Sequence, residues 1–161
     1  MLPIEMFSYL GAAFAMGLGA VGAGLGIGLA GSSGAEAVAR QPHAEGDITK
    51  TMLVGQAITE SPAIFALVVS IILAFNLHSL PADQLPSLVS VLGAGLCMGF
   101  GAIGAGVGSG FANSKGCEGV GKNPTASPKI LTVMLIGQAV CQAGAINSLI
   151  VSFSLLFGFG K

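Results

Sequence analysis

The residue in this sequence best suited to chemistry is Glu60, a carboxylate set inside a long apolar stretch. It lies in Gly55-Gln56-Ala57-Ile58-Thr59-Glu60-Ser61-Pro62, and the apolar run continues from Ala63 to Phe75. A carboxylate at the centre of a bilayer costs several kcal/mol unless it is neutralised or paired, so such residues are usually functional. We therefore take Glu60 as the candidate residue for binding and releasing a proton or a cation.

Three polar neighbours could contribute to a site at Glu60. Gln56 lies four positions earlier, so it shares a helix face with Glu60 and its amide can hydrogen-bond the carboxyl group. Thr59 and Ser61 offer hydroxyls on adjacent faces, although either can instead bond the carbonyl four residues before it. For Gln56 the alternative role is a hydrogen bond between helices.

Pro62 adds a backbone group to this set. Proline has no N–H, so it cannot donate the helical hydrogen bond to the carbonyl of Ile58, four residues earlier. The oxygen left free near Glu60 could accept a hydrogen bond from a neutral carboxyl group or bind a cation. The alternative is that Pro62 only kinks the helix.

The composition requires a membrane as the setting for these residues. Of 161 residues, 53% are hydrophobic and 8% are charged, and the mean hydropathy is +0.86. Soluble domains carry about 25% charged residues. The 26 glycines indicate helices that approach one another closely, and the net charge of -1 excludes a basic surface for nucleic acid.

Four apolar segments predict four transmembrane helices, because each exceeds the roughly 20 residues needed to span a bilayer. The segments are Phe7 to Val38, Ile48 to Phe75, Leu88 to Val120 and Ile130 to Phe159. Proline-containing breaks separate them, at Arg40-Gln41-Pro42, from Asn76 to Pro86, and at Lys122-Asn123-Pro124 with Pro128. No basic segment or clear cleavage site follows Met1, so we expect the first helix to be retained.

The chain is an internal duplication. Gly19-Ala20-Val21-Gly22-Ala23-Gly24 recurs as Gly101-Ala102-Ile103-Gly104-Ala105-Gly106, an offset of 101 − 19 = 82. We expect an all-α membrane protein of two tandem glycine-rich hairpins, residues 1–82 and 83–161. The offset takes Glu60 to Gln142, whose amide cannot ionise. Gln142 is either an inert remnant or a site-shaping residue that lends its amide across a helix interface.

The basic residues predict the orientation. Arg40, Lys50, Lys122 and Lys129 flank the first and third connections, whereas the middle connection has no Lys or Arg. The positive-inside rule places residues 40–47 and 122–129 in the cytoplasm and both termini outside, with Lys161 alone arguing the other way.

Two other patterns are better explained by helix packing. Gly17-Leu18-Gly19-Ala20-Val21-Gly22 fits a dinucleotide-binding pattern, but it lies within a membrane-length segment and lacks the preceding strand that such a site needs. Cys97, Cys117 and Cys141 lack metal-binding or redox spacing, so we expect small packing residues and no metal site.

Together these residues resemble the proteolipid of the rotor ring, or c subunit, of F-type ATP synthases over nearly the whole chain. The glycine-rich first helix, the polar loop Arg40-Gln41-Pro42 and the carboxylate Glu60 carry the resemblance. In that family the loop contacts the central stalk. Two sets of residues in this chain correspond to that loop. They are Arg40, Gln41 and Pro42, and their second copy Lys122, Asn123 and Pro124. Typical members are single hairpins, whereas this chain is doubled like the V-type proteolipids.

The resemblance implies a non-catalytic, multi-pass subunit of a bacterial plasma membrane, without a cofactor. Its partners would be further copies in a ring, central-stalk subunits, membrane lipids and a stator subunit that supplies an arginine and two aqueous half-channels. Glu60 would travel past lipid neutral or neutralised by sodium, because a desolvated anion is penalised. One carboxylate per four helices would lower the ion-to-ATP ratio, an effect that single-hairpin partners in a mixed ring would dilute.

The resemblance also bears on which ion is carried. Sodium-binding members have a Gln at the position of Ile27 and Ser109 and a Tyr at the position of Phe65, and neither is present. Ser61 and the Ile58 carbonyl do match sodium ligands. A dehydrated sodium ion needs several oxygens, whereas a proton needs the carboxylate and one acceptor. We therefore expect protons, with sodium as the alternative and a passive four-helix scaffold as the competing function.

Overall fold

Four long helices, two per hairpin, make up the computed structural model, which describes residues 4–75 and 85–158. They are α1 (Ile4–Arg40), α2 (Glu45–Phe75), α3 (Leu85–Lys122) and α4 (Ser127–Phe157). All four are long and apolar enough to cross a membrane. At 1.5 Å per residue, the 37 residues of α1 extend about 55 Å, past the hydrocarbon core into the headgroup region. The predicted all-α membrane fold is confirmed.

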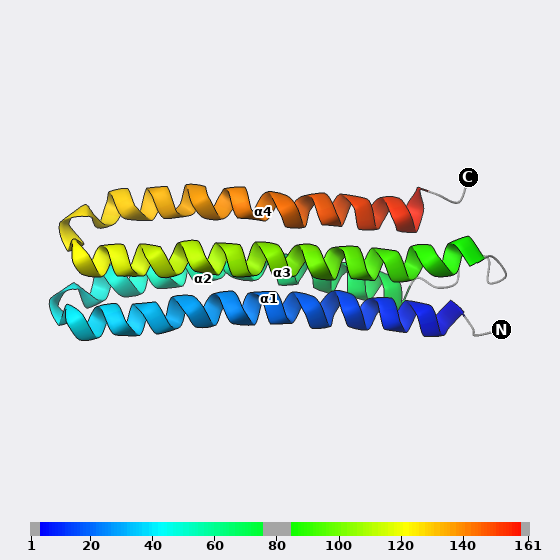
Figure 1. Cartoon of the computed structure of the whole chain (residues 1–161), viewed down its shortest axis with the longest axis horizontal. Helices are drawn as coiled ribbons and strands as arrows, with labels where there is room; N and C mark the ends of the chain where they lie inside the picture. The colour runs from blue at the N-terminus through cyan, green and yellow to red at the C-terminus, as the bar shows by residue number, and fades with distance from the viewer. Residues whose placement is uncertain (1–3, 76–84, 159–161) are drawn as a thin grey trace.

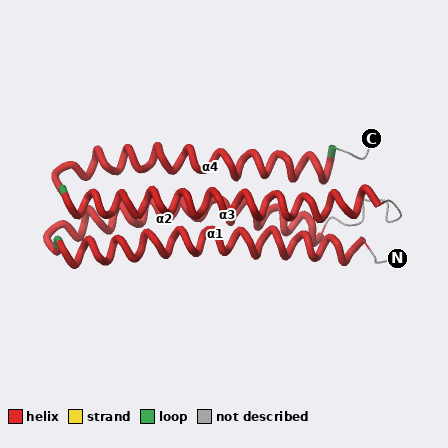
Figure 2. The backbone as a smooth tube through the Cα atoms, in the orientation of Figure 1, coloured by secondary structure: helices red, strands yellow, loops and turns green. Residues whose placement is uncertain are grey.

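The helices lie side by side, with both short connections at one end of the bundle and the chain termini toward the other (Figures 1 and 2). α1 packs most extensively on α3, α2 contacts both of them, and α4 lies mainly against α3 with a smaller contact to α2. α1 and α3 therefore form an inner pair, and α2 and α4 an outer pair.

Both short connections have the same local structure, because proline occupies the same place in each. Short 3-10 turns run over Pro42–Ala44 and Pro124–Ala126. Gln41 donates its backbone N–H to the Ala37 carbonyl at 2.9 Å, and Asn123 repeats this bond to the Gly119 carbonyl at 2.9 Å. The 82-residue offset thus relates the turns as well as the helices.

The sequence prediction differs from the structure at two prolines. α3 begins at Leu85, so Pro86, expected in the break, lies in the first helical turn, where its missing N–H is no cost. Pro128 likewise lies in the first turn of α4. Residues 76–84 of the predicted break from Asn76 to Pro86, the end of the fourth segment at Phe159, and Lys161 fall outside the described residues.

The glycines serve to bring helices together. Within the described residues, no glycine has a positive φ, so their conformational freedom is not the reason for their presence. A Cβ at Gly22 would lie 2.5 Å from the Ile103 Cα, and one at Gly106 would lie 2.7 Å from the Gly22 carbonyl carbon. The backbones of α1 and α3 therefore approach more closely than any side chain permits.

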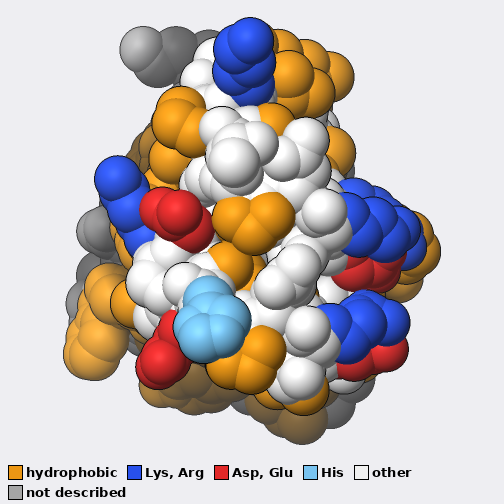
Figure 3. Space-filling model, turned by 90° about the vertical axis from the view of Figure 1, so that its left-hand side faces the viewer, with side chains coloured by type: hydrophobic (Ala, Val, Ile, Leu, Met, Phe, Trp, Pro, Cys, Tyr) orange, Lys and Arg blue, Asp and Glu red, His pale blue; other side chains and the backbone are white. Residues whose placement is uncertain are grey.

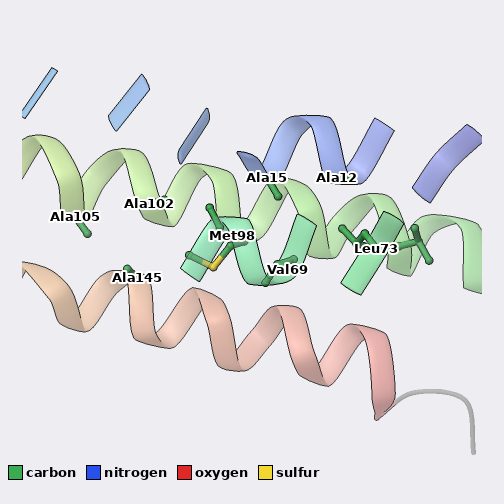
Figure 4. Packing of buried hydrophobic residues seen from close by; sticks show 10 residues of the cluster. Ala12, Ala15, Val69, Leu73, Met98, Ala102, Ala105 and Ala145 are labelled. Atoms are coloured by element: carbon green, nitrogen blue, oxygen red, sulfur yellow. The ribbon is translucent and has the colours of Figure 1, made fainter. Parts of the chain in front are cut away.

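Alanine and a few larger apolar side chains fill the remaining interior. Figure 4 shows this core, in which Val69 of α2 lies beside Met98 of α3, while Leu73 lies further along α2, at the end of the cluster away from Ala102. A second cluster of Ala37, Ala44, Ile48 and Val120 closes the end near the short connections. Many large apolar side chains remain exposed, as expected for surfaces that face lipid or other helices.

We predict that Gly106→Ala lowers the free energy of unfolding. Alanine improves helix propensity by about 1 kcal/mol, but overpacking against backbone that cannot yield costs about 1–3 kcal/mol. Gly46→Ala is the matched control, because no heavy atom lies within 4 Å of its added Cβ. Titration of the purified chain with SDS in mixed micelles measures both. A Gly106→Ala protein as stable as the wild type would contradict this packing.

Candidate functional site

α2 holds Glu60 at its midpoint, fifteen residues from each end of the helix (60 − 45 and 75 − 60). The side chain is exposed on the surface of the single chain. Among residues 4–75 and 85–158, it has no hydrogen-bond or ion-pair partner. The carboxylate is therefore available to a group outside this chain.

Gln56 lies one turn before Glu60 and is tied to the inner helix. Its Nε2 donates to the carbonyl oxygen of Ile27 on α1 at 3.2 Å. In the second hairpin, Gln138 Nε2 lies 3.2 Å from the carbonyl oxygen of Ser109 on α3. Both ends of this bond shift by 82 residues, so the glutamine fastens the outer helix to the inner one in each hairpin.

The backbone oxygen released by Pro62 is occupied within the chain. Gln142 Nε2, on α4, donates to the Ile58 carbonyl oxygen at 3.0 Å. Gln142 also lies at the midpoint of its helix, fifteen residues from each end (142 − 127 and 157 − 142). Of the two roles left open for Gln142, the structure favours an amide lent across a helix interface, although it reaches Ile58 instead of Glu60.

Thr59 is fully buried and belongs to a polar network between α2, α3 and α4. Its hydroxyl donates to the Gly55 carbonyl at 2.8 Å, the local bond that was the alternative to a site role. Its oxygen also lies 3.3 Å from Ser109 Oγ and 3.2 Å from Gln138 Nε2. The Thr59 hydroxyl is thus engaged inside the bundle, whereas Glu60 is at the surface.

Gln138 is the centre of this network. Its Nε2 has four acceptors within 3.0–3.2 Å but carries two hydrogens, so it can satisfy two of them at a time. The amide oxygens of Gln138 and Gln142 are buried, and neither has a partner among the described residues. Both side chains therefore act in this fold as donors.

Sequence reasoning missed two residues of the interface, Gln138 and Asn113. Asn113 Nδ2 donates to the Met52 carbonyl oxygen at 3.1 Å, and its side chain occupies the space over Gly55. The repeat contained a signal for Asn113. Its equivalent in the first copy is Gly31, so this position carries a polar side chain in the second copy only. Gln138 aligns with Gln56 and carried no such asymmetry.

The remaining predicted residues fall into two groups. Ser61 is half-buried and Pro62 is buried in the middle of α2. The loop residues lie at the bundle end where Lys, Arg, Asp, Glu and His side chains gather (Figure 3). There Arg40 pairs with Glu36 at 2.9 Å, and the exposed loop residues include Gln41, Pro42, Lys122 and Asn123, while Pro124 is half-buried.

No group of three His, Cys, Asp or Glu side chains comes together in the described part of the chain. Cys97, Cys117 and Cys141 are unpaired.

A family model for the C subunit of ATP synthase matches the chain twice, over residues 10–73 and 92–155. The ATP synthase c subunit of Alkaliphilus oremlandii (strain OhILAs) is 52% identical over 68 residues, which cover 42% of this chain and 76% of that protein. One ATP synthase c subunit of Cereibacter sphaeroides (strain ATCC 17029), numbered 2 in that organism, is 46% identical over 72 residues, which cover 45% of this chain and 87% of that protein. The ATP synthase c subunit of Dehalococcoides mccartyi (strain BAV1) is 46% identical over 71 residues, which cover 44% of this chain and 93% of that protein.

We predict that Gln142→Leu destabilises the bundle by about 1–3 kcal/mol, because it leaves the part-buried Ile58 carbonyl without a donor. Ile146→Leu, at an exposed position one turn later, is the control. Thermal unfolding followed by circular dichroism in detergent compares the two variants. Equal midpoints would show that the Gln142 bond contributes nothing to stability.

Proposed function

The chain belongs to the family of ATP synthase C subunits, and from this membership we propose that it carries protons on Glu60 within a membrane rotor ring. The family assigns it a non-catalytic role in ion translocation, as a multi-pass membrane subunit of a ring. The finer points, namely the ion, the residues that bind it, the orientation and the individual partners, are our proposal.

The observation that carries the proposal is the contrast between Glu60 and Gln142. Both lie at the midpoints of outer helices, yet Gln142 is bonded inside the chain and Glu60 is exposed without a partner among the described residues. An ionised carboxylate facing hydrocarbon is strongly penalised, so Glu60 is expected to be neutral there and charged only at an aqueous, positively charged surface. That cycle of ionisation is what ion translocation requires.

The bond from Gln142 to Ile58 suggests how a neutral Glu60 is held. A protonated carboxyl group has one O–H donor, as Gln142 has its N–H, and needs one acceptor. If adjacent copies pack as the two hairpins do, the equivalent acceptor for Glu60 is the Val140 carbonyl of the next copy (58 + 82). That carbonyl already accepts a helical bond, but a carbonyl oxygen has two lone pairs and can accept another.

The same correspondence favours protons over sodium. Ser61 and the Ile58 carbonyl, the proposed sodium ligands, lie toward Gln142, since Ile58 is bonded to it and Ser61 is one turn further along the same face. Glu60 would lie at the boundary with the next copy. There the equivalents of Ser61 and Ile58 are Ala143 and Val140 of that copy, and Ile27 takes the place of Ser109. Few oxygens remain there for a dehydrated sodium ion.

The arrangement of the chain is compatible with coupling to rotation. Both short connections lie at one end of the bundle, where charged side chains gather (Figure 3). We propose that this end faces the cytoplasm of a bacterium and contacts the central stalk, while a stator arginine meets Glu60 at mid-membrane. The sequence supplies one such carboxylate per four helices.

We predict that a carbodiimide, which reacts with neutral buried carboxyl groups, labels Glu60 faster as the pH falls, and that sodium does not protect it. Mass spectrometry of intact rings measures the label, and Glu60→Gln identifies the site by losing it. The same variant should abolish ion transport through the reconstituted complex, whereas Gln142→Leu should retain it. Protection by sodium at neutral pH would mean that the carried ion is sodium and not the proton. Ion transport by the Glu60→Gln variant would favour a passive scaffold.

A further inference from the structure

The second hairpin has an open cavity where the first hairpin is closed. The cavity lies between α3 and α4, has a volume of about 450 Å³, and is lined by residues that include Lys115, Lys129, Val133 and Met134. This volume is within the range of sites for small molecules. Val133 is 71% exposed, whereas its equivalent in the first hairpin, Thr51, is 1% exposed. The two halves of the repeat therefore differ in whether this space is covered.

A side chain from α3 closes the space in the first hairpin. Asn113 occupies the position over Gly55 and donates to the Met52 carbonyl oxygen at 3.1 Å. The equivalent of Asn113 is Gly31, which has no side chain with which to fill the cavity over Gly137. If adjacent copies pack as the two hairpins do, the cavity stays open at the boundary between them. A ligand from outside the protein can then fill it.

Two lysines at this cavity take the place of a neutral and an acidic residue. Lys115 is the equivalent of Ser33, and Lys129 is the equivalent of Asp47. Lys115 donates to Glu118 at 2.8 Å, whereas Lys129 is exposed and has no ion pair or hydrogen bond among residues 4–75 and 85–158. Two cations against one carboxylate leave the cavity with a net positive charge.

The cavity lies at the depth where a lipid headgroup joins its acyl chains. Lys129 is in the first turn of α4, and Lys115 lies seven residues (122 − 115), or about 10 Å, before the end of α3. A lysine side chain is long enough to carry its charge toward the headgroups. Both lysines lie toward the end of the bundle where charged side chains gather (Figure 3). Along α4 the lining continues to Gly137, eight residues (137 − 129) or about 12 Å nearer the membrane centre.

We propose that this cavity binds an anionic phospholipid, with its phosphate at Lys115 and Lys129 and part of one acyl chain against Val133 and Met134. Basic pockets between transmembrane helices are suited to anionic headgroups. The apolar wall takes the chain, and the lysines favour an anionic lipid over a zwitterionic one. The first hairpin, with Asp47 in place of Lys129 and its space closed, offers no such site. The inference does not depend on which ion Glu60 carries.

Photolabelling of the full-length chain, reconstituted in lipid vesicles, tests the site. The probe is phosphatidylglycerol with a diazirine near the carbonyl end of one acyl chain, and phosphatidylcholine with the same chain is the reference lipid. We expect phosphatidylglycerol to label residues 112–116 and 129–137 about fivefold more, the effect of one lysine on an anionic lipid. Peptide mass spectrometry locates the label. The equivalent segments of the first hairpin, residues 30–34 and 47–55, should show no such preference.

Two variants separate the headgroup contact from the cavity. Lys115→Gln combined with Lys129→Gln should reduce labelling by phosphatidylglycerol to the level of phosphatidylcholine, whereas Lys50→Gln, at the same end of the first hairpin, should not. Val133→Phe keeps both lysines but fills the cavity, so it should reduce labelling of residues 129–137 by both lipids. Circular dichroism and native electrophoresis establish that each variant folds and assembles like the wild type.

The possible outcomes bear directly on the lipid site. Equal labelling by the two lipids, or equal labelling of the two hairpins, would overturn the proposal. Absence of label between α3 and α4 with either lipid would show that a second copy of the chain fills the cavity. Unchanged labelling of Val133→Phe would place the lipid on the lysines alone. Either of these two results would also overturn the proposal, and none of the four would change the role proposed for Glu60.

Discussion

The hydrogen bond from Gln142 to the Ile58 carbonyl connects the two outer helices at the depth where the chain can least tolerate an unpaired polar group. Pro62 removes the usual donor to that carbonyl, and water is absent from the bilayer core to replace it. A side-chain amide from α4 supplies the missing donor. The amide cannot ionise, whereas the equivalent position in the first hairpin carries Glu60, a carboxyl group.

The inner helices make these contacts possible because their glycines let them lie close together. α1 and α3 approach so closely that backbone meets backbone at Gly22 and Gly106. The outer helix α2 can then reach the inner helix α3 with side chains as short as Thr59 and Ser109. Close packing of the inner helices and a hydrogen bond donated by a side-chain amide between the outer helices join the two hairpins into one unit.

Much of this could be predicted from the sequence, because it depends on length, composition and repetition. The four helices, the two hairpins and the contrast of Glu60 with Gln142 follow from such features. The direction in which each polar side chain points could not be predicted. In helices that are apolar or small on all sides, no polar stripe marks a solvent face, so Thr59 and Glu60 looked like members of one site although one is buried and the other exposed. The donor for the Ile58 carbonyl comes from 84 residues away, beyond any local pattern.

The central claim is that only one of the two equivalent mid-membrane positions carries an ion. This claim is tested most directly by counting the ions moved per ATP hydrolysed by the complex in sealed vesicles. The comparison is a complex whose ring has the same number of helices but a carboxylate on every hairpin. If Glu60 is the sole carrier in a ring of this chain, the ratio is half that of the comparison complex. Equal ratios would contradict the account.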